Sequence, residues 1–534
     1  MGLLDRLKNG VKRLQANTKT GKEYKDVFDV DGVPAFRTFY NFMIFPAKYI
    51  YRGLYNAWHV VSAPTIGDAN ATRTLFRMDM AKAVCAELAG LVWSEGTEIH
   101  VSRNGEYVTD DTLQRFVNMV LAKNAFSVKM QEHIEQACAL GGGALKTYVT
   151  MRRDNNGEPI PGTEKIMIDY CMADQLVPTA WDNAEISEAV FVSRKAQDGY
   201  YYTRLEWHKW NGDTYVITND LYRSQMQDRG AQSQDILGYW YPLNDVYPYI
   251  ARETTINGLD KSLFCYYRMP IANNVDDNSP LGISVYGNAF DTLHALDICY
   301  DSLVREFRLG KKRIIVPAQS VRTVVDPESG QLRRYFDAND EAYEALNTDD
   351  PDSIKVQDNS LELRVEEHVQ ALNALLSVLC LQVGFSASTF SFDMASGIKT
   401  ATEVISENSK TYKTIKTIQN QITPAIEKLV HNIIQLGILY DLEFEGQKIS
   451  TLAAGGYDVS VTMEDAVLED NSTRLDRAIK LVSNGFISKK TAMTDPKYGL
   501  GMTNEEAEAE MQQMQAEKQV TARAFDVFST SLGE

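Results

Sequence analysis

The amino-acid sequence predicts an α+β fold in which two helices flank a β excursion and a much longer helix follows. Apolar residues recur three or four positions apart over 286–309 and again over 365–383, the spacing of helices with one buried face. The residues from 311 to about 362 instead show short strand and turn patterns. A third helical pattern over 400–440 would span about 60 Å at ~1.5 Å per residue.

The first of these helices combines an apolar stripe with a charged opposite face. Its stripe consists of Leu293, Leu296, Tyr300, Leu303 and Phe307. The opposite face carries Asp291, Asp297, Asp301 and Arg305. Asp301 and Arg305 are four residues apart, so we expect them to form an acid-to-base pair along the helix. Gly310 ends the helical pattern.

The second and third helices have equally clear limits. The second has a stripe of Leu372, Leu376 and Leu379, and Gly384 ends it. A segment rich in Ser, Phe and Gly follows it. The third helix contains Pro424, where we expect a kink. We expect the stripes of the first two helices to pack helices together.

The region before residue 165 alternates helices with strands. Amphipathic patterns predict helices over 74–93 and 127–140, and a strand over 98–101. Residues 109–111 are predicted to cap a further helix with apolar residues from Leu113 to Leu121. Residues 141–143 are three glycines that follow a helix and precede a strand. A phosphate-binding loop requires the reverse order, so these glycines indicate a helix C-cap and a turn.

Residues 165–225 predict a β-meander. Within it Arg204, Glu206 and His208 alternate with apolar residues, so they share one strand face. A histidine and a glutamate two positions apart could ligate a metal, but no second histidine lies near them in the sequence. We interpret the three residues as the polar outer face of the sheet.

Three further segments suggest contacts with other molecules. Aromatic residues gather between Phe39 and Thr65, where they form either a subunit contact or part of the core. Residues 1–25 form a basic amphipathic pattern, which suits a partner-binding or terminal helix or a membrane-surface helix. After a strand over 457–463 and a helix over 471–481, a polar helix begins near Glu505. Its weak stripe is exposed or is completed by other subunits.

Composition and charge narrow the function classes. The 534 residues, 44% of them hydrophobic, suffice for several domains. The formal net charge of −18 argues against a sequence-reading DNA-binding protein, which needs a basic surface. It does not exclude a ring that encloses DNA, although a solvated acidic surface is the simpler interpretation of the charge alone. The sequence contains no run of about eighteen apolar residues, the length that a membrane-spanning helix needs. The first residues do not resemble a signal peptide. We therefore expect a cytoplasmic protein.

Motifs for catalysis and metal binding are weak. Six cysteines are scattered without paired spacing, which favours free thiols over a zinc site or a disulfide framework. Residues 394–400 superficially resemble the end of a Walker A loop, but Ile398 separates Gly397 from Lys399. We therefore expect a non-enzymatic protein without metal or cofactor. The alternative is a metal-dependent nuclease built from dispersed carboxylates.

Several longer segments resemble the portal proteins of tailed bacteriophages, in the branch common among phages of Gram-positive hosts. The segments are Ser279–Tyr286, Glu306–Arg313, Phe385–Asp393, Lys399–Asn408, Ala81–Ala89 and the two short stretches within 173–179. The similarity extends over most of the chain and is poor only at the termini. It implies a ring, usually of twelve subunits, at one vertex of the capsid.

The resemblance also implies a division of the chain. Residues 1–280 would form the N-terminal wing, 281–310 a stem helix, 311–362 the clip, 363–384 a second stem helix, 385–399 the tunnel loop, 400–465 the long wing helix and a strand, and 466–534 the helical crown and tail. The helix, β excursion, helix and long helix predicted from periodicity fit this plan. A long helix needs neighbours to brace it, and a β excursion between two helices is suited to docking.

The function implied is a conduit through which double-stranded DNA is packaged and ejected. The subunit would assemble in the host cytoplasm and reside in the virion, without a membrane. Its partners would be further copies, usually making a dodecamer, double-stranded DNA, the terminase large subunit, a head–tail adaptor, and the major capsid and scaffolding proteins. A capsid or neck structural protein without a channel is a further alternative.

The resemblance nominates two sets of contact residues. Candidates to face DNA in the tunnel are Ser386, Ser388, Asp393 and Lys399. Candidates for partner docking in the clip are Lys311, Lys312, Arg313, Arg322, Arg333 and Arg334. Lys399 is equally well explained as a solvated residue at a helix start. The clip cations are equally well explained as charges that offset a helix end and solvate a β face.

Overall fold

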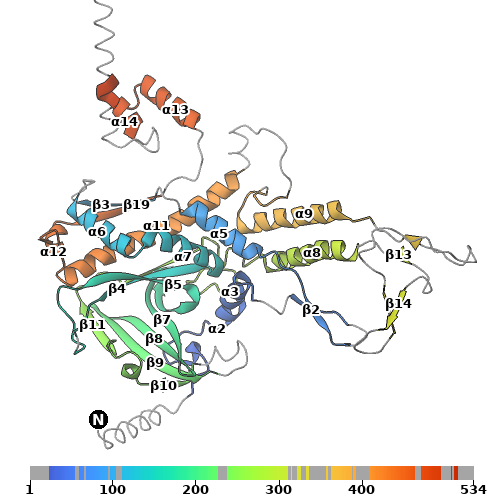
Figure 1. Ribbon diagram of the computed structural model, residues 1–534. Coiled ribbons are helices and arrows are strands. Elements are labelled where there is room, and N and C mark those ends of the chain that lie inside the picture. Colours follow the sequence, from blue (N-terminus) through green and yellow to red (C-terminus); the bar gives the residue numbers. More distant parts are fainter. Residues whose placement is uncertain are drawn as a thin grey trace, which may run out of the picture. The chain divides into compact units, whose positions relative to one another are not determined.

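The computed structural model (Figure 1) describes most of the chain in separate segments. They are residues 23–54, 59–64, 68–93, 97–103, 111–154, 156–183, 185–226, 237–310, 314–315, 322–325, 332–335, 357–358, 362–387, 389–392, 408–463, 471–494, 507 and 510–514. The chain divides into two compact units. Unit 1 contains Met1–Ser396 and Asn408–Glu464, and unit 2 contains Gly397–Glu407 and Asp465–Glu534.

Helices of unit 1 occur where apolar residues recur three or four positions apart. They are α2 (Arg37–Phe39), α3 (Phe45–Tyr51), α5 (Met80–Val92), α6 (Thr112–Lys123), α7 (Phe126–Leu140), α8 (Phe290–Leu309), α9 (Val365–Val383), α11 (Ser409–Leu439) and α12 (Ile449–Leu452). Shorter helical turns are η1 (Val27–Asp29), η2 (Tyr40–Ile44), η3 (Ala173–Gln175) and η5 (Leu243–Asp245). Gly141 ends α7 with a φ of 89°, in the left-handed region that glycine favours. The predicted C-cap is confirmed.

Six strands form the larger sheet of unit 1. They are β6 (Leu176–Asp182), β7 (Glu185–Gln197), β8 (Tyr200–Asn211), β9 (Thr214–Gln225), β10 (Tyr239–Tyr241) and β11 (Glu253–Asn257). Strands β6 to β9 pair antiparallel in chain order, and both β10 and β11 pair with β9. The predicted meander is therefore present from residue 176 onward.

A three-stranded antiparallel sheet lies beside the larger one (Figure 1). Its strands are β12 (Phe264–Arg268), β4 (Gly142–Thr150) and β5 (Lys165–Met172), with β4 in the centre. The prediction that residues 165–172 begin the meander is wrong. The turn η3 separates β5 from β6, so the two strands join different sheets.

Five two-stranded pairs complete the strands described. They are β1 (Val60–Ser62) with β2 (Thr72–Thr74), β3 (Glu98–Arg103) with β19 (Tyr457–Thr462), β13 (Ile314–Ile315) with β16 (Gln357–Asp358), β14 (Arg322–Val325) with β15 (Leu332–Tyr335), and β17 (Glu443–Phe444) with β18 (Gln447–Lys448). Strands β13 to β16 lie between α8 and α9 in the sequence. A β excursion between two helices is thus confirmed for these strands.

The longest helix, α11, packs on the three-stranded sheet through β12 and β4, and on α5 (Figure 1). Isoleucine and leucine residues on its inner face are fully buried, among them Ile422, Ile426 and Leu429. Pro424 lies inside the helix, which continues on both sides of it. The predicted start at residue 400 lies outside the described residues, and the helix as described begins at Ser409.

Two predicted helices begin later in the chain than expected. The helix over 74–93 starts only at Met80, because Thr72–Thr74 is strand β2 and residues 75–79 are not helical. The helix expected from residue 286 starts at Phe290. Before it, a Cβ atom on Gly282 would lie 2.1 Å from the carbonyl oxygen of Gly141. The chain there is a non-helical segment pressed against the end of α7.

The described part of unit 2 is helical. It contains α13 (Asn471–Ser483) and α14 (Lys489–Thr494). Gly485 follows α13 with a φ of 72°, as expected for a glycine that ends a helix. Across the described residues of both units, we find no helix with the length and hydrophobicity to cross a membrane.

Candidate functional site

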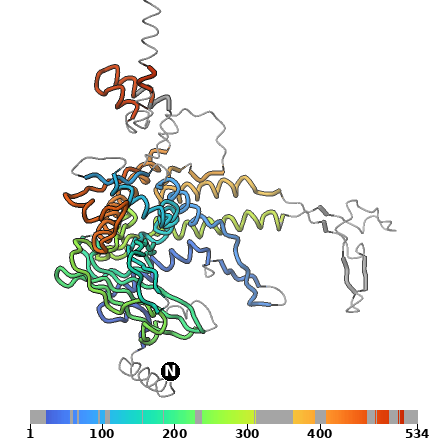
Figure 2. The backbone as a smooth tube through the Cα atoms, turned by 60° about the vertical axis from the view of Figure 1, so that its left-hand side comes forward, coloured from blue at the N-terminus to red at the C-terminus, as the bar shows by residue number. Residues whose placement is uncertain are grey.

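Helices α8 and α9 run side by side, away from the sheets (Figures 1 and 2). Their directions are opposite, because Glu306 near the end of α8 binds Arg364 at the start of α9 through contacts of 3.1 and 3.3 Å. Residues of both predicted stripes are buried between them or beneath them. The buried members are Leu293, Leu296, Leu372, Leu376 and Leu379, each at most 3% exposed.

The far end of α8 departs from the simple stripe. Tyr300 and Leu303 are half-buried, and Phe307 is 51% exposed. The inner faces of the two helices are therefore packed tightly near the body of unit 1 and more loosely toward residues 307 and 365. Close packing of leucines makes this pair a single rod, which is the property a long projecting element needs.

The second face of α8 is buried by residues 59–64 and 68–78, which include strands β1 and β2. Asp297 accepts hydrogen bonds of 2.8 Å from His59 Nε2 and from the Met78 amide. Asp301 accepts two from Arg73, of 2.8 and 2.7 Å, and one of 3.1 Å from the Phe76 amide. Both aspartates are at most 3% exposed.

These contacts revise the predicted charged face of α8. Asp301 was expected to pair with Arg305 along the helix surface, but its hydrogen bonds come from Arg73 and Phe76 across the fold. Burial opposes ionisation of Asp301, yet the hydrogen bonds from Arg73 and Phe76 outweigh it and lower its pKa. The amides of Phe76 and Met78 are both used in contacts with α8. This explains why residues 75–79 are not helical.

Replacing Arg73 should loosen the hairpin from α8. In Arg73→Ala the buried Asp301 carboxylate loses its bidentate partner, and we expect unfolding free energy to fall by about 2–3 kcal/mol. Hydrogen exchange at residues 60–74 should rise at the same time. Denaturant unfolding and exchange mass spectrometry measure the two effects.

Arg77→Ala is the matched control. The Arg77 guanidinium lies 3.9 Å from Asp79 with both side chains substantially exposed, so its loss should cost less than about 0.5 kcal/mol. Equal losses in the two variants would contradict the role given to Asp301.

The loop after α9 begins with a buried polar contact to α11. The Ser386 amide donates to Thr411 Oγ1 at 2.9 Å, and the two hydroxyls are 3.1 Å apart. Gly384 has a φ of 91°, and Thr414 Oγ1 donates to its carbonyl at 2.7 Å. Ser386 is 5% exposed. In the subunit it therefore fastens the start of the loop.

The remaining candidate contact residues are described only in part. Ser388, Asp393 and Lys399 lie outside the described residues, as do Lys311, Lys312 and Arg313. Arg322 is on β14, and Arg333 and Arg334 are on β15 of the same antiparallel hairpin. The hairpin pairs Arg322 with Tyr335 and Val324 with Arg333. The Walker-like stretch over 394–400 also lies outside the described residues.

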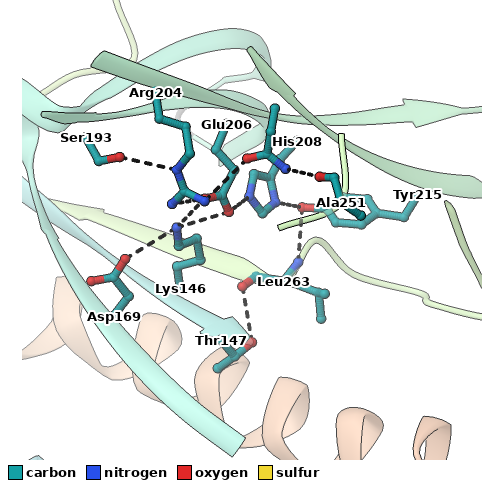
Figure 3. A network of polar contacts seen from close by, with 11 residues as sticks. Lys146, Thr147, Asp169, Ser193, Arg204, Glu206, His208, Tyr215, Ala251 and Leu263 are labelled. Carbon is teal, nitrogen blue, oxygen red and sulfur yellow. Dashed lines mark hydrogen bonds and ion pairs between the residues drawn. The ribbon is translucent and has the colours of Figure 1, made fainter. Parts of the chain in front are cut away.

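A buried polar network joins the three-stranded and the six-stranded sheets (Figure 3). Lys146 on β4 lies 3.1 Å from both carboxylate oxygens of Glu206 on β8, and 3.3 Å from Asp169 on β5. Arg204 approaches Glu206 to 2.8 Å. His208 Nε2 lies 2.9 Å from Glu206 Oε1. The sequence interpretation of these strand residues as a polar outer face is wrong.

The network holds its members in defined ionisation states. Burial opposes the charge of Glu206, but Lys146, His208 and Arg204 outweigh it and hold its pKa far below the usual range. Burial lowers the pKa of His208, and Glu206 offsets this only in part. Tyr215 accepts from the Leu263 amide at 3.3 Å, so its hydroxyl can donate to His208 Nδ1 at 2.8 Å. A neutral His208 protonated at Nε2 satisfies all these contacts.

Sequence reasoning missed this network for an identifiable reason. Alternation of polar and apolar residues predicts one wet and one dry face of a strand. Here Leu205 is fully buried on one face and His208 is 1% exposed on the other, because a second sheet covers the polar face. The available signal was Lys146, a single cation within the apolar strand that the sequence places at 144–149.

A second buried histidine makes the fold sensitive to acid. His133 Nε2 lies 3.0 Å from the Cys171 carbonyl oxygen, and Tyr267 OH lies 2.8 Å from His133 Nδ1. Burial lowers the pKa of His133 to about 4. The unfolded chain, with a histidine pKa near 6.5, binds a proton at higher pH than the folded chain. Stability from neutral His133 is therefore full above about pH 6.5 and is lost as the pH falls toward 4.

We expect the unfolding free energy to drop by about 2–4 kcal/mol between pH 7 and pH 4 through His133 alone. Denaturant midpoints measured across this range test it. His133→Gln keeps polar groups for Tyr267 and Cys171 but cannot ionise. The slope of its unfolding free energy against pH should therefore be smaller, by the equivalent of up to one bound proton. An unchanged slope in that variant would contradict a neutral buried His133.

The described residues hold no cluster of three or more histidine, cysteine, aspartate or glutamate side chains placed to bind a metal ion. A pocket of about 400 Å³ lies among α5, α6 and α7. Most of its lining is apolar, including Trp93, Leu121 and Phe126. The lining of this pocket does not bring together the polar groups of a catalytic centre. The most distinctive arrangement in the described chain remains the braced helix pair with its intervening strands.

The sequence matches the protein family described as "Phage portal protein, SPP1 Gp6-like" over residues 52–524. The chain belongs to this family. A search of curated protein sequences gave no match. Family membership confirms the resemblance to tailed-phage portal proteins and assigns the chain a phage portal role as a component of the virion. In this SPP1 Gp6-like portal protein, the match includes α8, α9 and α11 together with the residues between them.

Proposed function

We propose that the chain is the repeating subunit of a ring, usually of twelve copies, at one capsid vertex. Double-stranded DNA would pass through the centre of the ring during packaging and ejection. The observation that carries the proposal is the family match over residues 52–524, which spans the antiparallel pair of α8 and α9 and the strands between them. A paired, leucine-packed rod suits the wall of a channel.

We assign the parts of the chain as follows. Residues 281–310 and 363–384 would form the stem, 311–362 the clip, 385–399 the tunnel loop, 1–280 and 400–465 the wing, and 466–534 the crown and tail. The clip would dock the terminase large subunit and the head–tail adaptor, and its cations would meet acidic patches on them. The wing and crown would face the capsid and scaffolding proteins.

The charge of the chain suits a sliding conduit. Each copy carries a formal net charge of −18, so a ring of many copies is strongly acidic. Acidic faces toward the channel would discourage tight binding of phosphates, while a few cations such as Lys399 would contact the backbone briefly. Sequence preference is not required, because backbone contacts carry no sequence information.

Mass measurement of the assembled particle, combined with electron-microscope images of its symmetry, tests the proposal. Closed rings with a central hole are expected, with a mass near a whole multiple of 60.0 kDa. A solitary monomer, or an assembly without a hole, would overturn it. Metal-dependent cleavage of DNA that a single Asp or Glu substitution abolishes would instead support the nuclease alternative.

A further inference from the structure

Helix α9 carries a second apolar stripe that is exposed in the subunit. Its members are Ala371, Ala374, Val378 and Leu381, spaced by three, four and three residues. Val378 is 43% exposed and Leu381 is 57% exposed. This spacing is the seam by which one helix packs along another. The leucines at 372, 376 and 379 are already buried within the subunit, so the second stripe is available for a different helix.

Helix α8 also has an exposed face. Two of its faces are occupied, one by α9 and one by residues 59–64 and 68–78. Ile298 lies on a third face and is 45% exposed. Glu306 contacts both Arg364 and His368, which aligns the two antiparallel helices. Ile298 lies eight residues before Glu306 on α8. Residues 372 and 376 lie eight residues after Arg364 and His368 on α9, so the same step along the antiparallel pair leads to them.

The large side chain of Ile298 is thus level with the small Ala374, which lies midway between residues 372 and 376. A second copy related by rotation about an axis parallel to the helices has each residue at the same height along that axis. Ile298 of one copy would then meet Ala374 of the next, a large residue against a small one. Within one subunit both residues are exposed.

Charges at the outer end of the pair favour the same arrangement. Glu366 and Glu367 are exposed at the start of α9. Arg305 lies on the Ile298 face of α8, seven residues and about two helical turns further on. Because the helices are antiparallel, these acidic and basic groups are at the same level. A neighbouring copy therefore brings opposite charges together, whereas a partner that placed α9 against α9 would bring like charges together.

We propose that the Ala371–Leu381 stripe of α9 packs against the Ile298 face of α8 in the next copy of this chain. The contact joins two different faces, so it repeats from copy to copy and can close into a ring. This inference rests on the proposed ring and adds the surface through which its stems meet. Helix α9 would then have two stripes that contain leucine. One packs inside the subunit, and the other packs between subunits.

Cysteine cross-linking of the full chain tests the proposal. In a Cys299→Ala background, the double variant Ile298→Cys/Ala374→Cys should form disulfides between copies after mild oxidation. Denaturing gels without reductant should then show a ladder of multimers. Ile298→Cys/Val128→Cys is the matched control, because Val128 is 64% exposed on α7 and outside the proposed contact. It should give at least tenfold less multimer.

Leu381→Asp supplies a second readout. Its denaturant midpoint should match the parent within error, while its yield of rings should fall at least tenfold. Three outcomes would each overturn the proposed contact without overturning the proposed ring. They are rings that give no ladder, an equal ladder in the control, and a full yield of rings from Leu381→Asp. Failure of the parent chain to form rings would overturn the proposed function itself.

Discussion

Leu372→Asp/Leu376→Asp should abolish both the folding of the helix pair and the formation of rings. The two leucines are 1% and 2% exposed. The variant therefore removes two buried apolar side chains and places a carboxylate at each buried position. Loss of each leucine side chain alone costs about 2–5 kcal/mol, and buried charge adds to it. The total is comparable to the whole stability of a typical domain. Circular dichroism, denaturant unfolding and particle imaging would record the outcome.

Gln370→Asp/Ala374→Asp is the matched control on the same helix. Both positions are exposed, so this variant should keep the parent's unfolding midpoint. It should still assemble poorly if Ala374 lies in the contact between copies. Intact rings from the Leu372→Asp/Leu376→Asp variant would show that α9 does not pack through its leucine stripe.

Lys146→Met should cause the second large loss of stability. Methionine preserves much of the apolar stem but removes the cation that faces Glu206 and Asp169. Lys146 is 4% exposed, and Glu206 would remain in the same buried space with only Arg204 and His208 beside it. We expect the unfolding free energy at pH 7 to fall by about 3–4 kcal/mol.

The double variant Lys146→Met/Glu206→Gln distinguishes lost pairing from lost packing. Neutralising Glu206 removes the unpaired charge, so the double variant should recover part of the loss in a double-mutant cycle. The deficit of Lys146→Met should also shrink as the pH falls, because a protonated Glu206 no longer needs a cation. Additive losses and a pH-independent deficit would mean that packing of the lysine stem accounts for the effect.

The two buried networks have related consequences for a portal subunit. The Lys146–Glu206 network ties the two sheets into one body, and the Asp297 and Asp301 contacts tie α8 to residues 59–64 and 68–78. Buried ion pairs add little net stability but penalise alternative arrangements that leave a charge unpaired. A stem helix fixed in this way keeps its outer face in one orientation toward the next copy.

Helix periodicity identified most long elements correctly. The helices over 365–383 and 127–140 begin and end within one residue of their predicted limits, because apolar stripes and glycine C-caps are local signals. The start of α5 was misplaced because Leu75 and Met78 continue the apolar spacing. Their segment is not helical all the same, since the amides of Phe76 and Met78 donate to aspartates more than two hundred residues away. No local pattern carries that information.

The sequence by itself determined the α+β class, the order of two helices around a β excursion, and the likeness to portal proteins that the family match confirms. These follow from periodicity and from runs of residues, which are properties of neighbours along the chain. Only the tertiary structure decided which polar groups are buried. Arg204, Glu206 and His208 became a sheet-to-sheet network, and Asp297 and Asp301 became anchors. A charged side chain is stable in the interior only beside its partner, and in both cases the partner comes from a distant part of the chain.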